Sequence, residues 1–256
     1  MPNSNERMPA LFVSHGAPTL AVDRVSGADF RRLADAVPEP RAVLVFSAHW
    51  TDAPAAIGTV TKRPLLHDYH GFPRELYALR YAAPVANDLV ARITSLVPSI
   101  ERDDERPWDH GVWVPLLHMY PRADVPLLQV SLPIAWPPRH LIELGNLLAP
   151  LRDEGVLVLG SGGAVHNLGR IDWNHGAPPA WAVDFESWLR ERLTTSAVDD
   201  VIAFRERAPG TRLAHPTDEH FLPLLVALGA ARDDAVTFPI EGFEYGSLSR
   251  LAVRFG

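Results

Sequence analysis

The sequence predicts an α/β protein built as a single domain. Short apolar runs rich in Val, Leu and Phe alternate along the chain with longer segments whose apolar residues recur every three or four positions. The first pattern is typical of buried strands and the second of amphipathic helices, so their alternation favours a sheet flanked by helices. A length of 256 residues suits one domain, and no linker divides residues 1–256.

Six apolar runs are predicted to be strands. The first two contain residues 11–13 and 43–46, are rich in β-branched and aromatic residues, and stop at a small residue followed by a histidine. A later run, 156–159, leads into a glycine-rich turn. The predicted strands span residues 9–14, 42–48, 55–60, 126–132, 155–160 and 236–241.

Five segments are predicted to be helices, at residues 28–36, 85–97, 139–151, 180–194 and 219–229. Segment 85–97 places Val85, Leu89, Ile93 and Leu96 on one face. Segment 219–229 follows Thr217, a candidate N-cap with acidic residues after it.

Three stretches are predicted to lie outside regular structure. Residues 1–8 are mostly polar and are expected to form a flexible N-terminal extension. Residues 61–82 and 101–113 are expected to be long loops rich in His, Tyr, Trp or Pro. Long ordered loops in a compact domain are often functional.

Composition excludes several kinds of chemistry. The chain has no cysteine, so disulfides, thiolate-bound metals and a thiol nucleophile are ruled out, and a metal would need His, Asp or Glu ligands. The net charge is −7 with scattered basic residues, which does not favour nucleic acid as a partner. No apolar run is long enough to span a membrane and no signal peptide is recognised. We therefore expect a cytoplasmic protein.

Histidines at strand ends are the main functional signal. His15 and His49 each follow a predicted buried strand. In α/β sheets, ligands bind at the carboxyl ends of the strands. A single histidine there is more often a satisfied polar residue, but two in matching settings favour a metal site held by two imidazoles.

Two further histidines are candidates for the same site. His166 follows the turn at 160–163, which lacks the lysine of a phosphate-binding loop and is expected to let a substrate approach the backbone. His166 would then be a base or a ligand. His110 lies in the second long loop, where a substrate contact is one interpretation and the adjacent Gly111 indicates a special backbone conformation.

The other polar candidates carry weaker signals. His67 and His70 are spaced for metal binding but lie on a loop, and His118 is expected in the core or at an interface. His140, His175 and His215 are expected at the surface or in loops. Glu241 ends a predicted strand and would either join the site or remain a surface acid. The chain has neither the Gly-x-Ser-x-Gly motif of serine hydrolases nor the HExxH motif of zinc proteases.

Seven segments, in order along the chain, together match one family. They are PALFVSHG (9–16), SAHW (47–50), HDYHGFP (67–73), WDHGVW (108–113), GGAVHNL (162–168), PTDEHFLPL (216–224) and EGFEYGSLS (241–249). The chain resembles the class III extradiol ring-cleavage dioxygenases, and most closely their DOPA 4,5-dioxygenase-like branch.

The resemblance implies a single α/β domain with a central mixed sheet flanked by helices on both faces. It also implies one divalent metal per chain, held by His15, His49 and His220. The wider class has a glutamate as third ligand, so His220 is a departure from the two-His-one-carboxylate pattern of non-haem iron. Fe(II) is expected for activity, and an all-histidine site is also compatible with bound Zn(II). By the same resemblance, His166 is the acid–base residue and His110 binds substrate from a second sphere.

The implied activity is oxidation of a catechol with incorporation of both atoms of O₂. His67, Tyr69, Trp108 and Trp113, from the two long loops, are the candidate substrate contacts, with loop packing as the alternative. A catechol and O₂ are the expected partners, without nucleic acid or membrane, for a monomer or small homo-oligomer. Two other hypotheses stay open: a zinc-dependent hydrolase or hydratase using the same histidines, and a non-catalytic protein of this fold.

Overall fold

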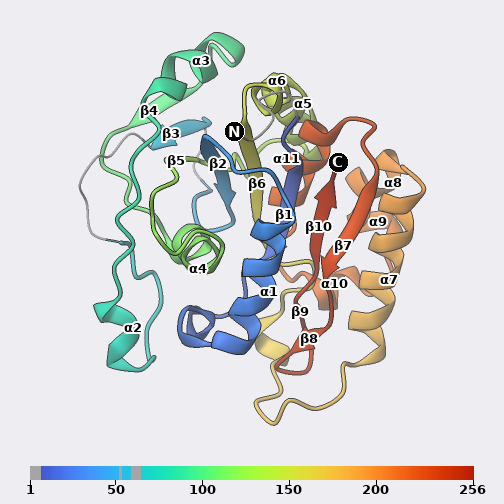
Figure 1. Ribbon diagram of the computed structural model, residues 1–256. Helices are drawn as coiled ribbons and strands as arrows, with labels where there is room; N and C mark the ends of the chain where they lie inside the picture. The colour runs from blue at the N-terminus through green and yellow to red at the C-terminus, as the bar shows by residue number, and fades with distance from the viewer. Residues whose placement is uncertain (1–6, 52–53, 59–64) are drawn as a thin grey trace.

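Eight strands of the computed structural model form one mixed sheet, in the order β4-β3-β5-β2-β6-β1-β10-β7 (Figure 1). The structure describes residues 7–51, 54–58 and 65–256. Helices lie on both sides of the sheet, so the predicted α/β class and mixed central sheet are confirmed. The strands are β1 (Ala10–Ser14), β2 (Ala42–Ser47), β3 (Ala56–Gly58), β4 (Glu101–Asp103), β5 (Leu127–Val130), β6 (Val156–Gly162), β7 (Val236–Ile240) and β10 (Ala252–Phe255), with a separate pair, β8 (Phe243–Glu244) and β9 (Leu248–Ser249).

The centre of the sheet is parallel. Strand β6 pairs in parallel with β1 on one side and β2 on the other, and β2 pairs in parallel with β5. Ser14 at the end of β1 lies opposite Gly162, and Ser47 at the end of β2 lies opposite Ser161. The carboxyl ends of β1, β6 and β2 therefore meet at one edge of the sheet, while β10 and β3 run antiparallel to their inner neighbours.

The two faces of the sheet bury separate hydrophobic clusters. Phe12 and Leu44 point into one cluster and Leu11 and Val45 into the other, because successive side chains of a strand alternate between its faces. Each of these side chains is fully buried. Burying a side chain of this size stabilises a fold by about 1.5–3 kcal/mol, so both faces contribute to the core.

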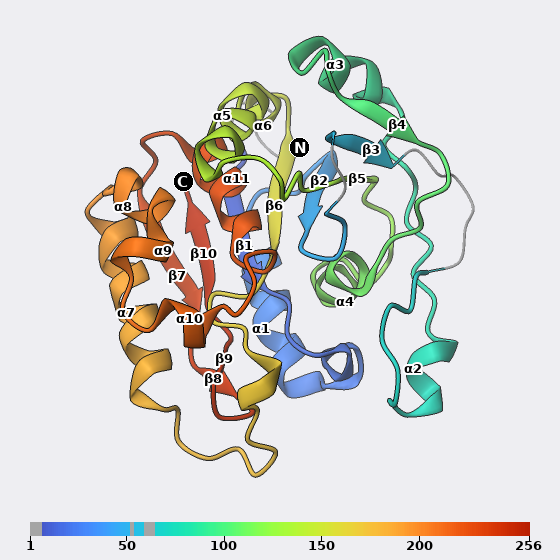
Figure 2. The ribbon, with the colours of Figure 1, turned by 180° about the vertical axis from the view of Figure 1, so that it is seen from behind.

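Helices cover both faces (Figures 1 and 2). The first cluster receives residues of α3, α5, α7 and α11, and the second receives residues of α1 and α4. The helices are η1 (Pro18–Val22), α1 (Arg24–Asp35), α2 (Arg74–Ala78), α3 (Asp88–Leu96), α4 (His110–Met119), α5 (Pro138–Leu148), α6 (Pro150–Asp153), η2 (Leu168–Arg170), α7 (Ala180–Thr194), α8 (Val198–Ile202), α9 (Phe204–Arg207), α10 (Thr211–Ala214) and α11 (Leu222–Ala231).

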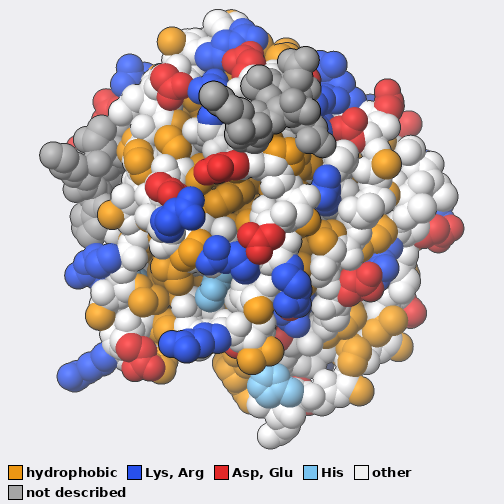
Figure 3. Space-filling view, viewed as in Figure 1, with side chains coloured by type: hydrophobic (Ala, Val, Ile, Leu, Met, Phe, Trp, Pro, Cys, Tyr) orange, Lys and Arg blue, Asp and Glu red, His pale blue; other side chains and the backbone are white. Residues whose placement is uncertain are grey.

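The surface carries both acidic and basic side chains. On the face seen in Figure 3, acidic and basic side chains are interspersed rather than gathered by sign. Among the described residues, no helix combines the length and apolar character needed to cross a membrane.

The largest error of the sequence prediction is at α4. The expected loop 101–113 contains β4 and the first turn of this helix. Helix α4 is apolar on all sides, contains Pro115, and has eight of its ten residues buried, so it has no polar face whose period would reveal a helix. Strands β4, β8, β9 and β10 were also not predicted; β8 and β9 have only two residues each, and β4 consists of three charged residues.

Several predicted boundaries move by a few residues. Helix α1 begins at Arg24 rather than 28, because the Asp23 carboxylate accepts hydrogen bonds from two amides of the first turn. Helix α11 begins at Leu222 rather than 219. Helix α2 lies within the expected loop 61–82, of which 61–64 are outside the described residues, as are 59–60 of the predicted strand 55–60. Residues 1–6 of the expected extension are also outside them, and Met8 is buried.

The start of α11 packs directly on β6. A methyl group added at Gly160 would lie 2.3 Å from the carbonyl oxygen of Pro223 in α11. Only glycine allows this approach of two backbones. Gly160 is therefore a packing requirement rather than the substrate-facing residue expected from the sequence, whereas Gly162 and Gly163 of the same turn line the cavity described below.

We expect Gly160→Ala to lower the free energy of unfolding by about 1–3 kcal/mol, because the methyl group forces α11 away from the sheet. Urea denaturation measures this change. Gly169→Ala is the control, since this exposed position meets only the Asn167 side chain, at 3.2 Å. Equal stability of the two variants would contradict the packing argument.

Candidate metal centre

Three histidines reach the site from three adjacent parallel strands. His15 directly follows β1, His49 lies two residues after β2, and His166 lies four residues after β6. Since β1 and β2 both pair with β6, the structure brings these side chains to the same edge of the sheet. The His15 and His49 ring centroids are 5.0 Å apart.

His220 is delivered by the segment that precedes α11. The amide of Gly163 donates a 2.9 Å hydrogen bond to the carbonyl oxygen of His220. A methyl group at Gly162 would lie 2.1 Å from that same oxygen. The glycine-rich turn therefore fixes the backbone of His220 against the end of β6.

Five imidazoles form one cluster. The ring centroid of His220 lies 5.4 Å from that of His15 and 5.0 Å from that of His49. His110, at the start of α4, lies 5.3 Å from His15 and 4.1 Å from His49. His166 stacks on His220, with centroids 3.5 Å apart and ring planes at 5°.

The protonation of His15 is set by a chain of three hydrogen-bonding groups. Ser161 Oγ lies 3.0 Å from His15 Nδ1 and donates its own proton to the carbonyl oxygen of Gly111 at 2.5 Å. Pro115, four residues after Gly111 in α4, has no amide proton to offer that carbonyl. Because its hydroxyl proton is already donated, Ser161 accepts from Nδ1–H, and Nε2 of His15 keeps its lone pair.

Asp68 holds two histidines at once. Its Oδ1 lies 2.7 Å from His110 Nδ1, and its Oδ2 lies 3.2 Å from His49 Nδ1. Burial raises its pKa, but the hydrogen bond and charge of His110 outweigh this and lower the pKa of Asp68 to about 2. The carboxylate therefore accepts Nδ1–H from both rings, which leaves the lone pair of His49 on Nε2.

His220 is oriented in the same way. Its Nδ1 lies 3.2 Å from Glu219 Oε1, which also accepts a 2.8 Å hydrogen bond from the Thr217 hydroxyl. Its Nε2 is buried and has no hydrogen-bond partner among the described residues. An orphaned nitrogen in the protein interior is costly unless a ligand satisfies it.

Asp109 supports the segment that carries His49. This fully buried carboxylate accepts hydrogen bonds from Ser47 at 2.6 Å and from Gln129 at 2.5 Å. Arg106 joins it, at 3.3 Å, to the carbonyl oxygen of His49, at 2.6 Å. A methyl group at Gly111 would meet Ser47 Oγ at 2.5 Å, so this glycine serves close packing and not an unusual backbone conformation.

Burial keeps the imidazoles of His15, His49, His166 and His220 neutral. It lowers the pKa of His15 and His220 well below the usual range, and the neighbouring rings lower both further. It also lowers the pKa of His49 and of His166 to about 4. Neutral imidazole is the form that binds a metal.

The donor set fits a divalent cation. His15 Nε2 and His49 Nε2 are 3.1 Å apart with both lone pairs facing. Two nitrogens bound to one ion at about 2.1 Å lie roughly 3.0–3.4 Å apart, so this spacing suits a shared ion. Among the described residues, two groups have ligand atoms that all lie within 4.8 Å of one another and could hold a metal: His15, His49 and His110, and His166, Glu219 and His220. His220 thus lies in the second group, beside the pair His15 and His49.

The cluster opens into a cavity of about 460 Å³. His15, His49, His110, His166 and His220 all line it, and so does Tyr69, whose ring centroid lies 5.7 Å from that of His110. The other candidate substrate contacts, His67, Trp108 and Trp113, are not among the lining residues. Trp113 is fully buried, and its ring centroid lies 5.8 Å from that of His67. The His67 ring in turn contacts the Tyr69 ring, with centroids 5.7 Å apart.

Other sequence candidates lie elsewhere. His215 was expected in a loop or at the surface, but it is fully buried and its Nε2 lies 2.9 Å from the Ala164 carbonyl oxygen. Glu241 is exposed and pairs with Arg190 at 2.7 Å, outside the cavity. His118 is half-buried, with Nε2 2.7 Å from the Leu20 carbonyl oxygen.

Sequence reasoning did not assign the residues that orient the rings. Asp68 and Glu219 each stand beside a histidine in a motif, and Ser161 lies in the turn 160–163, but the linear pattern does not specify which ring each of them contacts. Asp109, directly before His110, does not orient that ring, because its carboxylate binds Ser47 and Gln129. Glu244 lines the cavity and was not singled out either.

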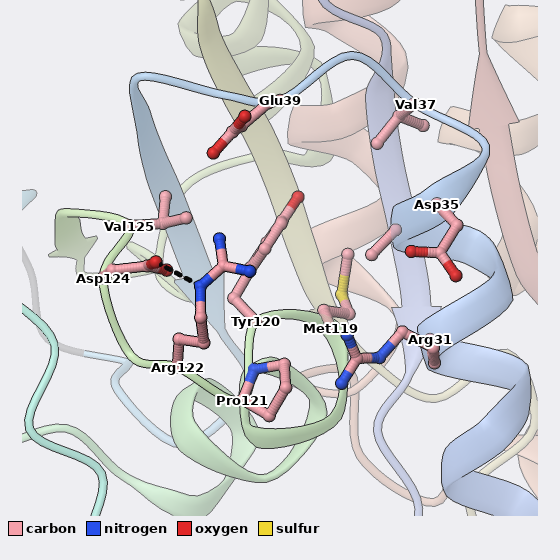
Figure 4. A pocket seen from close by; sticks show the side chains of 11 residues that line it. Arg31, Asp35, Val37, Glu39, Met119, Tyr120, Pro121, Arg122, Asp124 and Val125 are labelled. Carbon is pink, nitrogen blue, oxygen red and sulfur yellow. Dashed lines mark hydrogen bonds and ion pairs between the residues drawn. The ribbon is translucent and has the colours of Figure 1, made fainter.

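A second hollow is separate from this site. It has a volume of about 250 Å³ and lies beside Arg31 of α1 and Met119 at the end of α4 (Figure 4). Arg122 and Asp124 in its wall form an ion pair with each other at 2.6 Å. None of the described residues that line it is a histidine.

A buried imidazole cluster at the carboxyl edge of a mixed α/β sheet defines a candidate metalloenzyme. The family described as the catalytic LigB subunit of aromatic ring-opening dioxygenase matches residues 10–256. The chain belongs to this family and is a ring-cleaving extradiol dioxygenase. The resemblance stated from the sequence is thus confirmed.

Curated relatives and a solved structure agree with this assignment. The chain is 38% identical to a 4,5-DOPA dioxygenase extradiol of Escherichia coli (strain K12), over 99% of this chain and 96% of that protein. It is 39% identical to a protein of the same name from Beta vulgaris, over 88% and 87%. A crystal structure of an uncharacterized protein from Escherichia coli K12 matches with a TM-score of 0.84 at 36% identity, covering 98% of this chain and all of that one.

The metal-free protein is expected to lose stability as the pH falls from about 6.5 toward 4. The unfolded chain protonates its histidines near 6.5, whereas His49 and His166 in the folded protein resist protonation until about 4. The unfolded state therefore binds more protons in this window, and each such histidine contributes up to about 1.4 kcal/mol per pH unit. Urea denaturation at several pH values measures the slope.

His49→Gln should reduce this slope, and His140→Gln, at an exposed position, should leave it unchanged. A stability that stays constant across the window would show that the buried rings are protonated in the folded state.

Proposed function

We propose that this enzyme opens the ring of a catechol with O₂ at a metal held by His15, His49 and His220. The observation that carries the proposal is the convergence of unprotonated nitrogens: two Nε2 atoms 3.1 Å apart and a third, buried and without a partner. They face a cavity of about 460 Å³, which is large enough for a single substituted aromatic ring. The relatives named 4,5-DOPA dioxygenase extradiol support a catechol as substrate.

His220 is favoured over His110 as the third ligand. The Nε2 of His220 is buried without a hydrogen-bond partner among the described residues, which is not the case for His110. Its Nδ1 faces a carboxylate, an arrangement that makes a ligating imidazole more basic. His110 lies close enough to His15 and His49 to be the alternative, so variants must decide between them.

Three neutral imidazoles would leave the full charge of a divalent ion available to an anionic catecholate. When bound there, Fe(II) would supply open positions for catechol and O₂ and the electron transfer between them, and Zn(II) would fit the same ligands without redox chemistry. Everything else falls to side chains of the cavity wall, which bind the ring, orient it and move its protons.

His166 is proposed as the acid–base residue. It lines the cavity, and burial lowers its pKa to about 4, so at neutral pH it holds a lone pair that can accept a proton from a catechol hydroxyl. Its stacking on His220 fixes the plane of the ring. The same nitrogen can return the proton later in the reaction.

His110 is proposed to bind the substrate from the opposite wall. Asp68 accepts its Nδ1–H at 2.7 Å and so fixes its ring plane and tautomer. Its Nε2 is then the ring nitrogen left for a hydrogen bond with a substrate hydroxyl. Tyr69 is proposed as the aromatic contact, with His67 and Trp113 supporting it from behind. Trp108 is half-buried among loop residues and would act only through packing.

The remaining expectations about this protein are part of the same proposal. A small-molecule catechol and O₂ are its proposed partners, in the cytoplasm, for a monomer or small homo-oligomer. The absence of cysteine from the chain agrees with a reducing compartment.

Two classes of variant should differ in whether they lose bound metal together with turnover. His15→Ala and His220→Ala should lose bound metal and activity together, because each removes one of three ligands. His166→Ala should keep the metal and lose turnover by about 10²–10⁴-fold, the usual effect of removing a general base. Elemental analysis and initial rates measure the two properties.

His140→Ala, at an exposed position, is the control for both measurements. Full metal content in His220→Ala with loss in His110→Ala would transfer the third ligand to His110. Loss of metal in His166→Ala would remove its assignment as the base.

Anaerobic loading with Fe(II), followed by air and a panel of catechols, should give a yellow ring-opened product. The same protein loaded with Zn(II) should give none, because zinc cannot pass electrons between catechol and O₂. Absorbance and O₂ consumption measure the reaction. Zinc-dependent hydrolysis without O₂ uptake under any condition would favour the hydrolase hypothesis.

A further inference from the structure

The carboxylates of the cavity wall have no Lys or Arg beside them among the described lining residues. Of the described residues that line the cavity, none is Lys or Arg, and the two acidic ones are Asp68 and Glu244. Asp68 is engaged by His49 and His110, as described above. Glu244 is therefore the acidic side chain of the wall that forms no ion pair among the described residues.

Glu244 lies close to the metal centre in the fold. Strand β8 follows β7, whose Ile240 lies opposite Ala252, which in turn lies opposite Val13 of β1. The segment 241–251 is thus at the carboxyl end of β1, where the β8–β9 pair appears in Figure 1. A methyl group at Gly16, the residue after His15, would lie 3.1 Å from Glu244 Oε1.

The contacts of Glu244 leave its charge largely uncompensated. It accepts a hydrogen bond from the amide of Ala17. Arg250 and His175 are near enough to act on it electrostatically, but Arg250 is bound to Asp29 at 2.5 Å. None of the ion pairs found among the described residues includes Glu244. Burial accordingly raises the pKa of its carboxyl group.

The wall around Glu244 is apolar and aromatic. Leu168, Ile171, Trp173, Tyr245 and Leu248 line the same cavity. Such a wall accommodates a short hydrocarbon side chain but provides no cation for an acidic one. A carboxylate in this setting favours a ligand that brings its own positive charge, since charge-assisted hydrogen bonds strengthen where water is excluded.

We propose that Glu244 determines substrate specificity by binding the ammonium group of a catechol that carries an aminoalkyl side chain. The diol would lie at the histidine cluster and the side chain along the apolar wall, with the ammonium group at Glu244. The cavity would therefore prefer cationic catechols over neutral ones, and neutral ones over catechols with a carboxylate side chain. This inference rests on the proposed function of the histidine cluster.

Three catechols of similar size test the preference. Dopamine carries an ammonium group, 4-propylcatechol is its uncharged analogue, and 3,4-dihydroxyphenylacetate carries a carboxylate. In the Fe(II)-loaded enzyme, kcat/KM should fall in that order. Glu244→Gln keeps an oxygen that can accept from the Ala17 amide but removes the charge. It should lower the dopamine to 4-propylcatechol ratio of kcat/KM about 10- to 100-fold.

Glu241→Gln is the matched control. Glu241 is three residues away, is exposed and pairs with Arg190 outside the cavity, so this variant should keep the wild-type ratio. A Glu244→Gln enzyme that loses activity equally on all three substrates would overturn the proposal and assign Glu244 to holding the turn at Ala17. A wild-type enzyme without preference for dopamine over 4-propylcatechol would overturn it as well.

A binding measurement separates this inference from the proposed reaction. Tyramine has the ammonium side chain but only one ring hydroxyl, and 4-propylphenol is its uncharged analogue. Calorimetry on the metal-loaded protein should show tighter binding of tyramine, and Glu244→Gln should weaken it about 10- to 100-fold. If no catechol is cleaved yet tyramine binding depends on Glu244, the proposed reaction fails and the ammonium site stands. If catechols are cleaved but tyramine binds no better than 4-propylphenol, the ammonium site fails alone.

Discussion

The parallel pairing of β6 with β1 and β2 is the interaction on which the site depends. It aligns three strand ends within one residue of register, so that the residues after them approach from fixed backbones. The glycines at the end of β6 extend this order to a fourth segment, because they admit the carbonyl oxygen of His220 against the strand. Four histidines thus converge without any of them lying in a regular element.

The second constraint is the protonation state of the imidazole rings. A cluster of imidazoles could share protons among themselves, and then no nitrogen would be free for a ligand. Here His15, His49 and His220 each donate a hydrogen bond from Nδ1–H to an oxygen. The acceptors are Ser161, Asp68 and Glu219, respectively. Burial then opposes further protonation, so geometry and desolvation favour the same unprotonated Nε2 atoms.

Much of this arrangement could be predicted from the sequence. Strand ends followed by histidines are local patterns, and the carboxyl edge of an α/β sheet is a general binding position. The supporting contacts could not be predicted, because Ser161 and Gly111 are 50 residues apart and Asp68 and His110 are 42 apart. Helix α4 was not predicted because it is buried on every side. The burial of His215 was not predicted because its segment has the sequence of a loop, although short helices enclose it. Such contacts arise from tertiary packing and cannot be predicted from the structural preferences of single residues.

The proline in α4 has an effect beyond its own helix. With an ordinary residue at position 115, the Gly111 carbonyl could be satisfied inside α4, and the hydroxyl of Ser161 would be free to rotate. It could then give its hydrogen to His15, and that ring would present N–H, rather than an electron pair, to His49. A missing amide in a helix on one face of the sheet thus selects which isomer of an imidazole stands at the strand edge. The choice is made by the fold itself, before any ligand arrives.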